Sequence, residues 1–429
     1  MHERISVGAS VKSVAILTAA SLLWNPRAFK EAKALASAKF NVVVYGVSRD
    51  QSGLEADQSL AHRHGFVFES VAAASKTDRG RHRRLVWPRL RRRLGSSLFQ
   101  LFGTQNRWQI GTVVPELLRA ARNANADYYI VHLEQAAWVG VALMREGYNV
   151  GVDMEDWYSE DLLPDARTSR PVGLLRELER KLLTRGAHAT CPSYAMSKAL
   201  EQEFSCNPPA IVYNAFQWSQ RKFLDGLRKD RLNKQSPSIH WFSQTLGHGR
   251  GLEDLLAALP LVNHRAEIHL RGNPVAGFKK WLSDRVSEGW SDRIFVHDLV
   301  SNEELLSRIA EHDIGFAGEM NYCRSRDLTV TNKILYYLLA GLAVVASDTA
   351  GQREIAEQAP EAVLLYPVGN ITALAAHLNK LLSSTDRLRR AKAAALQAAE
   401  QTFCWERQEA VLLKTVEQAL SKQATANQM

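Results

Sequence analysis

Short apolar runs recur along the whole chain and alternate with segments whose hydrophobic residues have helical spacing. Apolar runs of this kind are typical of strands in a parallel sheet, because helices cover both faces of such a sheet. The alternation therefore predicts an α/β fold with doubly wound parallel sheets, and it argues against all-helical and all-β folds.

The predicted strands form two series of similar size. The first series comprises 13–20, 41–47, 128–132, 150–154, 187–191 and 210–212, and the second comprises 238–243, 267–271, 293–297, 313–317, 343–347 and 362–366. Two such series predict two Rossmann-like domains. Ligands of open α/β sheets bind at the carboxyl ends of the strands, so a central cleft between the two domains is the expected site.

The boundaries of these domains follow from changes in composition along the chain. We predict an N-terminal domain over residues 1–214, a C-terminal domain over 215–400, and a terminal helix over 401–429 that packs back across both. The segment 214–237 is polar and basic, as expected of a linker. The tail from 388 to 420 is rich in Ala, Leu and Gln, and so it is predicted to be helical.

Composition excludes several classes of protein. Of the 429 residues, 46% are hydrophobic and 23% are charged, which excludes a disordered or collagen-like chain and is enough for two cores. The net charge of +9 makes an anionic partner plausible. The four cysteines have no CxxC spacing, which indicates neither a disulfide framework nor a zinc site and favours a reducing compartment.

The apolar stretch over 14–24 is too short to span a bilayer, which takes about 20 residues. Two interpretations stay open for it. It could be the core of a signal peptide, because basic residues precede it. We favour the first strand of a βαβ unit, because a helical pattern and a second apolar run follow directly.

The segment around Lys333 predicts an anion site. Thr331 or Asn332 can cap a helix that runs to Ala340 and ends at Gly341. The N-terminus of a helix offers unbonded N–H groups and the positive end of the dipole, and Lys333 adds a full charge there. A capped helix with a solvated lysine is the alternative, and on this segment alone it is the better supported one.

Two further turns carry a cation next to glycine. Gly249 and Gly251 flank Arg250 after the strand 238–243, and Arg271 precedes Gly272 after the strand 267–271. Glycine lets backbone N–H groups approach an anion closely, and a guanidinium can neutralise a diphosphate. A mobile loop is the alternative for a single turn of this kind. Several cationic turns in one domain indicate phosphate binding more specifically.

These residues carry a resemblance to a known family. The motif residues are Ser243-Gln244-Thr245, Gly249-Arg250-Gly251-Leu252-Glu253, Thr331-Asn332-Lys333-Ile334, Tyr337, Ala340-Gly341-Leu342 and Gly351-Gln352. They resemble the nucleotide-sugar domain of family 4 of the retaining GT-B glycosyltransferases (glycosyl transferases group 1), in its "NK…Y…AG" variant. Asn25-Pro26-Arg27 and the segments 177–183 and 212–215 are similar, more loosely, to parts of that family's acceptor domain.

The resemblance implies a GT-B enzyme, resembling hexosyltransferases, that transfers a sugar from a UDP- or GDP-linked donor to a glycan or lipid-linked acceptor. It implies retention of configuration, no metal, no cofactor, and a role in cell-surface polysaccharide biosynthesis. Arg250 and Lys333 would hold the diphosphate and stabilise it as it leaves. His132 occupies the place of the family's cleft histidine and would contact donor sugar or acceptor. A structural histidine is the alternative there.

One departure from the family concerns the donor. The places of the family's two glutamates hold Leu328 and Tyr336, and a tyrosine gives one hydrogen bond where a carboxylate gives two. Glu319 or Asp327 could serve the sugar hydroxyls instead. The expected donor-binding set is Gln244, Thr245, Gly249, Gly251, Arg271, Gly272, Glu319, Asp327, Thr331, Asn332 and Tyr336. The departure leaves a second hypothesis open: a non-catalytic GT-B module that binds a glycan or a protein partner.

An acidic run over 153–161 follows a strand of the first domain. A metal site or a general base are possible functions for it. A surface loop is the favoured interpretation, because adjacent carboxylates repel one another unless something offsets their charge.

The strongest charge feature lies in the first domain. Residues 76–93 contain eight arginines and one lysine against the single acid Asp78, with leucines and a tryptophan between them. This pattern favours an interfacial segment on anionic lipid at the cytoplasmic membrane face, with no nucleic acid expected. Nucleic-acid binding and a solvated insert are the alternatives. The expected membrane-binding residues are Arg83, Arg84, Trp87, Arg91, Arg92 and Arg93.

Overall fold

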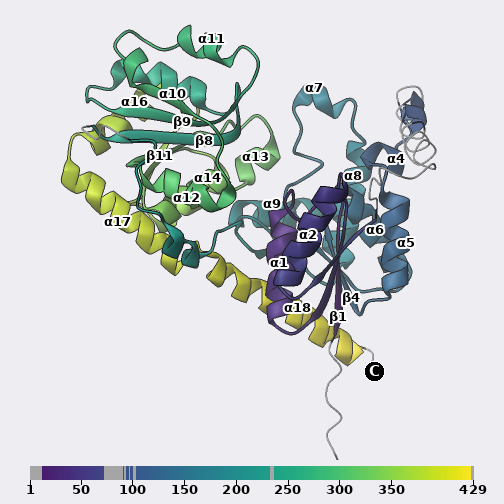
Figure 1. Ribbon diagram of the computed structural model, residues 1–429. Coiled ribbons are helices and arrows are strands. Elements are labelled where there is room, and N and C mark those ends of the chain that lie inside the picture. The colour runs from purple at the N-terminus through teal and green to yellow at the C-terminus, as the bar shows by residue number, and fades with distance from the viewer. Residues whose placement is uncertain are drawn as a thin grey trace, which may run out of the picture. The chain divides into compact units, whose positions relative to one another are not determined.

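The computed structural model describes residues 12–71, 90, 93–95, 97–99, 103–231 and 236–426 (Figure 1). The chain divides into two compact units. Unit 1 runs to Cys191 and also contains Ser197–Ile211 and the chain from Glu409 onward. Unit 2 consists of Pro192–Met196 and Val212–Gln408.

Unit 1 is built on one parallel sheet, whose described strands have the order β3-β2-β1-β4-β5-β6-β7. The strands are β1 (Ser13–Thr18), β2 (Asn41–Gly46), β3 (Val67–Ser70), β4 (Tyr128–His132), β5 (Val150–Asp153), β6 (Ala189–Cys191) and β7 (Ala210–Ile211). The helices are α1 (Pro26–Ser37), α2 (Gln51–Arg63), α4 (Arg107–Ile110), α5 (Val114–Ala124), α6 (Leu133–Arg145), α7 (Pro164–Arg167), α8 (Val172–Arg185) and α9 (Tyr194–Phe204). The strand order reverses between β1 and β4, as in a doubly wound fold.

Unit 2 repeats the same plan with the strand order β10-β9-β8-β11-β12-β13, again all parallel. The strands are β8 (Ser238–Leu246), β9 (Glu267–Pro274), β10 (Ile294–His297), β11 (Ile314–Ala317), β12 (Ala343–Ser347) and β13 (Val363–Tyr366). The α-helices are α10 (Leu252–Ala258), α11 (Phe278–Ser283), α12 (Asn302–Ala310), α13 (Arg324–Leu328), α14 (Asn332–Ala340), α15 (Ala350–Gln358), α16 (Ile371–Leu382) and α17 (Thr385–Gln401). Short 3₁₀ turns are η1 (Trp218–Phe223), η2 (Leu259–Leu261) and η3 (Ser291–Arg293).

The predicted strands are confirmed, with small differences at their ends. Residues 13–18 form β1, so the strand interpretation of the early apolar stretch is correct. The sequence analysis missed β3, because this edge strand has only one fully buried side chain, that of Phe68, and lacks a continuous apolar run. Among the helices of the described residues, none combines the length and hydropathy needed to cross a bilayer.

Helix α14 is apolar on nearly every side because it is covered on nearly every side. It packs against β11 and β12 of the sheet and against α12 and α17. Apart from its first residue and Tyr336, every residue of α14 is buried. A helix that is hydrophobic all round is stable only in such a position. This packing fixes α14 as a rigid support for Lys333 in its first turn.

The segment expected to be a linker is part of unit 2. The guanidinium of Arg221 donates to the carbonyl oxygen of Leu339, and Arg231 Nη1 lies 2.9 Å from Asp313 Oδ2. Two of the basic residues that resembled a solvated linker, Arg221 and Arg231, are therefore bonded to the domain that follows them. The sequence analysis was wrong here because polarity alone does not distinguish an exposed linker from a segment whose charges are paired.

The C-terminal tail forms two helices, α17 and α18 (Trp405–Ala426), separated by a short break. Phe403 and Trp405 are buried at this break. Helix α17 lies on the sheet of unit 2 and contacts α14, α16 and β12, whereas the residues of α18 from Glu409 onward belong to unit 1.

Four histidines cluster in the interior of unit 2. The ring centroids of His240 and His312 lie 4.5 Å apart, those of His269 and His312 4.6 Å apart, and His269 Nδ1 lies 2.9 Å from His297 Nε2. Burial, which disfavours the charged imidazolium, lowers the pKa of His312 to about 4 and that of His269 to about 2. The cluster is therefore neutral in the folded protein near neutral pH.

We expect acid to destabilise unit 2 through this cluster. In the unfolded chain this histidine binds a proton below its ordinary pKa of about 6.5, whereas in the folded protein His312 binds one only near pH 4 and below. The free energy of unfolding therefore falls as the pH falls through this window. His312 alone accounts for about 2 kcal/mol between about pH 7 and about pH 5. On acidification, urea unfolding should show a smaller loss of unfolding free energy for His312→Asn than for the natural chain. His62→Asn, an exposed control, should lose as much as the natural chain. Equal losses for His312→Asn and the natural chain would contradict this.

Candidate functional site

The turn after β8 packs against the end of β11. Gly251 has φ +80°, and a Cβ placed on it would lie 2.7 Å from the carbonyl carbon of Gly318, so only glycine fits. Gly318 precedes Glu319 in the chain. This contact therefore brings the turn that carries Arg250 next to Glu319, as expected of polar groups at the carboxyl edge of a parallel sheet.

Arg250 itself lies in the exposed part of this turn. Its Nη1 donates to Ser243 Oγ over 3.1 Å, which holds the guanidinium back over the end of β8. Gln244 and Thr245 are exposed at the same end of the strand. The N–H of Gly249 donates to Glu253 Oε1 over 2.8 Å, so this amide is bonded within the turn.

Lys333 lies in the first turn of α14 and is 9% exposed. Its Nζ lies 2.5 Å from Glu319 Oε1 and 5.6 Å from the centre of the Trp241 ring. A nearly buried ammonium needs a partner of opposite charge, and Glu319 is that partner here. The two residues that the sequence analysis assigned to diphosphate and sugar therefore lie in direct contact.

The N-terminus of α14 has no side-chain cap. Thr331 occupies the N-cap position, but its Oγ1 donates to Gln352 Oε1 over 3.3 Å instead of accepting from the helix. Asn332 Oδ1 accepts from Asn214 Nδ2 over 3.0 Å. The predicted side-chain cap is therefore wrong. The helix N–H groups next to Lys333 are left for another acceptor, which makes this end of the helix suited to an anion.

Gln352 holds these parts together. Its Nε2 donates to the carbonyl oxygens of Ala317 and Ser347, and it is fully buried. Ser347 Oγ accepts from the N–H of Glu319 over 2.8 Å. Gln352 thus joins the ends of β11 and β12 to Thr331. The sequence analysis quoted Gln352 only as part of the motif Gly351-Gln352 and assigned it no role.

Tyr336 faces an aromatic surface. Its ring stacks on Phe216 with centroids 3.6 Å apart and meets Phe242 edge-on at 5.6 Å. Burial raises the pKa of Tyr336 to about 12. The hydroxyl is therefore neutral and can donate as well as accept one hydrogen bond.

Three other residues that were expected to bind the donor are engaged in bonds or close packing within unit 2. Arg271 is 2% exposed, is paired with the carboxylate of Asp230, and donates to a backbone oxygen, so its guanidinium is not presented at the surface. A Cβ on Gly272 would lie 2.4 Å from Ser243 O, so glycine there lets β9 approach β8. Asp327 Oδ1 accepts from the N–H of Ala350 over 3.3 Å at the start of α15.

Most of the expected membrane-binding residues, Arg83, Arg84, Trp87, Arg91 and Arg92, lie outside the described residues. Arg93 is described, helical and exposed.

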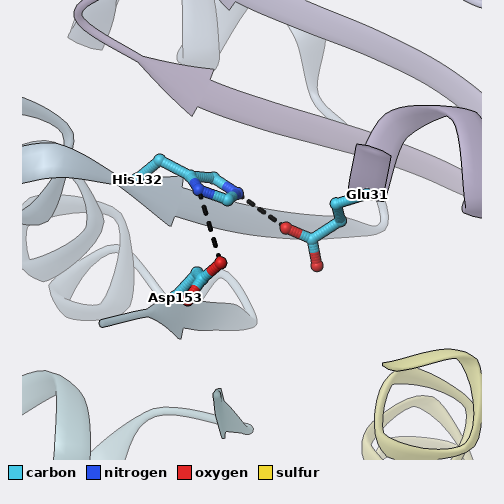
Figure 2. A group of neighbouring side chains, drawn as sticks. All are labelled: Glu31, His132 and Asp153. Carbon is cyan, nitrogen blue, oxygen red and sulfur yellow. Dashed lines mark hydrogen bonds and ion pairs between the residues drawn. The ribbon is translucent and has the colours of Figure 1, made fainter. Parts of the chain in front are cut away.

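Unit 1 has its own polar cluster at the end of β4. His132 is fully buried, with Nε2 2.6 Å from Glu31 Oε2 and Nδ1 2.7 Å from Glu155 Oε1. Figure 2 shows the imidazole between Glu31 and Asp153, whose Oδ2 lies 3.8 Å from Nδ1. Burial by itself lowers the pKa of His132, but the hydrogen bonds to the two glutamates raise it to about 10. His132 is therefore an imidazolium that donates from both nitrogens.

Arg27 neutralises the remaining acid of this cluster. Its Nε and Nη2 donate to the two oxygens of Asp153, each over 2.8 Å, and both side chains are buried. Burial alone would raise the pKa of Asp153, but the Arg27 guanidinium holds it below its usual range. The bidentate pairing is the strongest geometry for an arginine and a carboxylate.

Glu31, His132 and Asp153 are also the one group of possible metal ligands found in the described part of the chain, with donor atoms within 4.8 Å of one another. Both imidazole nitrogens are hydrogen-bonded, and both oxygens of Asp153 are bonded to Arg27. A metal ion would have to displace the guanidinium and remove a proton from His132. The arrangement as it stands is a network of paired charges.

Asn25 ties this network to the first turn of the unit. Its Oδ1 accepts from the N–H of Ala28 and so caps α1, while its Nδ2 donates to Glu155 Oε1 over 2.7 Å and to Thr18 Oγ1 over 3.2 Å. The sequence analysis noted Asn25 only as part of a resemblance. Its signal was an Asn-Pro pair after a strand, which is a common start of a helix.

Comparison with known proteins identifies the fold. Residues 237–384, within unit 2, match a family described as glycosyl transferases group 1. The chain has no significant sequence similarity to a curated protein. HepE from Anabaena, solved in complex with UDP, superposes with a TM-score of 0.69 at 16% identity, over 95% of this chain and 100% of that one. A sucrose-phosphate synthase from Thermosynechococcus elongatus superposes with a TM-score of 0.67 at 14% identity, over 97% and 100%. The predicted GT-B fold is thus confirmed.

We expect the Arg27 pair to stabilise unit 1. Arg27→Ala should lower the free energy of unfolding by about 3 to 5 kcal/mol, because it leaves Asp153 buried and without its partner. The matched control is Arg122→Ala, which removes an exposed ion pair with Glu146 and should lower the free energy of unfolding far less. Urea unfolding of both variants measures the difference. Similar losses would show that the buried pair adds nothing beyond a surface pair.

Proposed function

We propose that this protein is a glycosyltransferase that uses a nucleotide diphosphate sugar as donor. The observation that carries the proposal is the uncapped start of α14 with Lys333 in its first turn. Its support comes from the family match of the surrounding residues and from HepE, which was solved with UDP and with UDP-glucose. Retention of configuration and independence from metal are parts of the proposal that follow from the sequence resemblance alone.

In this proposal the diphosphate lies at the N-terminus of α14. The helix N–H groups and Lys333 bind one phosphate, and Arg250 turns from Ser243 to bind the other. The charge that develops on the leaving diphosphate is then stabilised by these two cations. Glu319 is released from Lys333 and is available to the sugar hydroxyls.

Tyr336 takes the position beside the ribose. It offers one neutral hydroxyl next to the aromatic surface formed with Phe216 and Phe242. One hydrogen bond holds a ribose less firmly than the two bonds of a carboxylate. We therefore propose that donor affinity depends mainly on the diphosphate. The acceptor is proposed to be a glycan or lipid-linked glycan of a surface polysaccharide.

We expect Lys333→Ala to weaken UDP binding by about tenfold or more, because a charge-assisted hydrogen bond in a nearly buried position is lost. Titration calorimetry with UDP measures this, and Lys280→Ala, an exposed helical lysine of the same unit, is the control. Unchanged affinity of Lys333→Ala would remove this residue from the donor site. If neither UDP nor GDP binds the natural protein at millimolar concentration, the hypothesis of a non-catalytic module is favoured.

We also propose that unit 1 attaches the protein to an anionic membrane surface. Residues 90, 93–95 and 97–99 are helical, and Leu90, Leu94 and Leu98 are 43%, 55% and 47% exposed. Their spacing of four residues places these leucines on one face of a helix. The arginine-rich sequence that precedes them supplies the charge that anionic lipid attracts.

Leu94→Glu should reduce co-sedimentation with phosphatidylglycerol vesicles by about tenfold or more, because it replaces an exposed apolar side chain that would insert into the lipid by one with the same sign of charge as the lipid. Leu163→Glu is the control, since Leu163 is 51% exposed elsewhere in the same unit. Binding that is unchanged in Leu94→Glu would contradict the proposal. Binding to random oligonucleotides that falls steeply with salt would favour nucleic acid instead.

A further inference from the structure

A cavity with a volume of about 300 Å³ lies at the amino edge of the sheet of unit 1. It is formed by the last turns of α6 and α8, two helices that contact each other, and by the chain that leads into β5 and β6 (Figure 1). We call it the α6–α8 cavity. Strand β5 runs from Val150, which lines this cavity, to Asp153 in the charge network with His132. The α6–α8 cavity and that network therefore lie at opposite edges of one sheet.

The α6–α8 cavity has an excess of positive charge. Its described lining residues include three cations and no acid. Arg145 ends α6, Arg185 ends α8, and Lys181 lies one turn before Arg185. The charge of Lys181 is offset, because its Nζ lies 2.9 Å from Glu177 Oε1. Arg145 and Arg185 form no hydrogen bond or ion pair with any residue that the structure describes, so two guanidinium groups are left without a counter-charge.

The two helix ends account for only part of this charge. The carboxyl end of a helix carries about half a negative charge, so two such ends offset about one of the two guanidinium charges. The backbone oxygens there are also bonded already, since Leu143 O accepts from the N–H of Glu146 and Leu182 O from that of Gly186. The side chain of Glu146 is paired with Arg122. Positive charge is therefore left over for a ligand.

The rest of the lining supplies an amide and an apolar wall. The side chain of Asn149 has no hydrogen-bond partner among the described residues and can donate as well as accept. Val141, Met144 and Val150 provide apolar surface. Apolar walls with a few polar groups are typical of small-molecule sites, and about 300 Å³ is at the lower end of their volumes. The α6–α8 cavity thus suits an anion that carries only a few carbon atoms.

We propose that the α6–α8 cavity binds a small phosphate monoester through Arg145 and Arg185. A phosphate monoester carries close to two negative charges at neutral pH, which matches two guanidinium groups. Each guanidinium can donate two parallel hydrogen bonds to phosphate oxygens, and the carbon part of the ligand lies against Met144. A concave cavity of this size favours a soluble molecule over a lipid surface. The proposal does not rest on the proposed function.

The test is a titration followed by NMR of the protein labelled with ¹³C-methyl methionine. The chain has six methionines, and Met144→Leu assigns the signal of the one that lines the cavity. Glycerol 3-phosphate is the probe, and glycerol is the control without phosphate, both at constant ionic strength. We expect glycerol 3-phosphate to shift the Met144 signal saturably at millimolar concentration and glycerol to leave it unchanged.

Arg145→Ala and Arg185→Ala should each weaken this binding by about tenfold or more, because each removes charge-assisted hydrogen bonds to the phosphate. Both arginines are exposed, so urea unfolding of the free variants should match that of the natural chain. The matched control is Arg63→Ala, which removes an exposed arginine at the end of α2 and should leave the binding unchanged.

Four results would overturn the proposal. These are a Met144 signal that glycerol 3-phosphate does not move, an equal shift with glycerol or added sodium chloride, unweakened binding in both arginine variants, and a shift with phosphatidic acid vesicles alone. Lys333→Ala separates this site from the proposed donor site, because it should leave glycerol 3-phosphate binding intact. Loss of the Met144 shift in Lys333→Ala would also contradict the proposal.

Discussion

The ion pair between Lys333 and Glu319 is the interaction on which the site of unit 2 depends. A lysine that is 9% exposed is stable as a cation only because a carboxylate lies 2.5 Å away. The pair is possible because the start of α14 and the end of β11 meet at the carboxyl edge of one sheet. In the proposed function an anion that binds Lys333 would take the place of Glu319, so donor binding and release of the glutamate would be coupled.

The backbone around this pair is organised by uncharged groups. The side-chain oxygen of Gln352 accepts from Thr331, and its nitrogen donates to backbone oxygens at the ends of β11 and β12. As a consequence Thr331 does not cap α14, and the helix amides remain open. The proposed diphosphate site at the start of α14 therefore depends on these polar contacts inside the fold.

Unit 1 uses paired charges for a different purpose. Glu31, Asp153 and Glu155 would repel one another, and Arg27 and the imidazolium of His132 offset their charges. The resulting network joins the ends of β1, β4 and β5 to the start of α1.

The sequence by itself determined the two parallel sheets and their order along the chain, because apolar runs between helical patterns have few other ways to be buried. It also placed Lys333 at a helix start and Arg250 in a glycine turn, since both follow from local spacing. Tertiary structure alone decided which cations remain accessible. Arg250 and Arg271 look alike in sequence, yet one is exposed and the other is buried against Asp230. Local sequence does not determine how strands align. It therefore cannot predict contacts between residues far apart in the chain, such as Lys333 with Glu319 or His132 with Glu31.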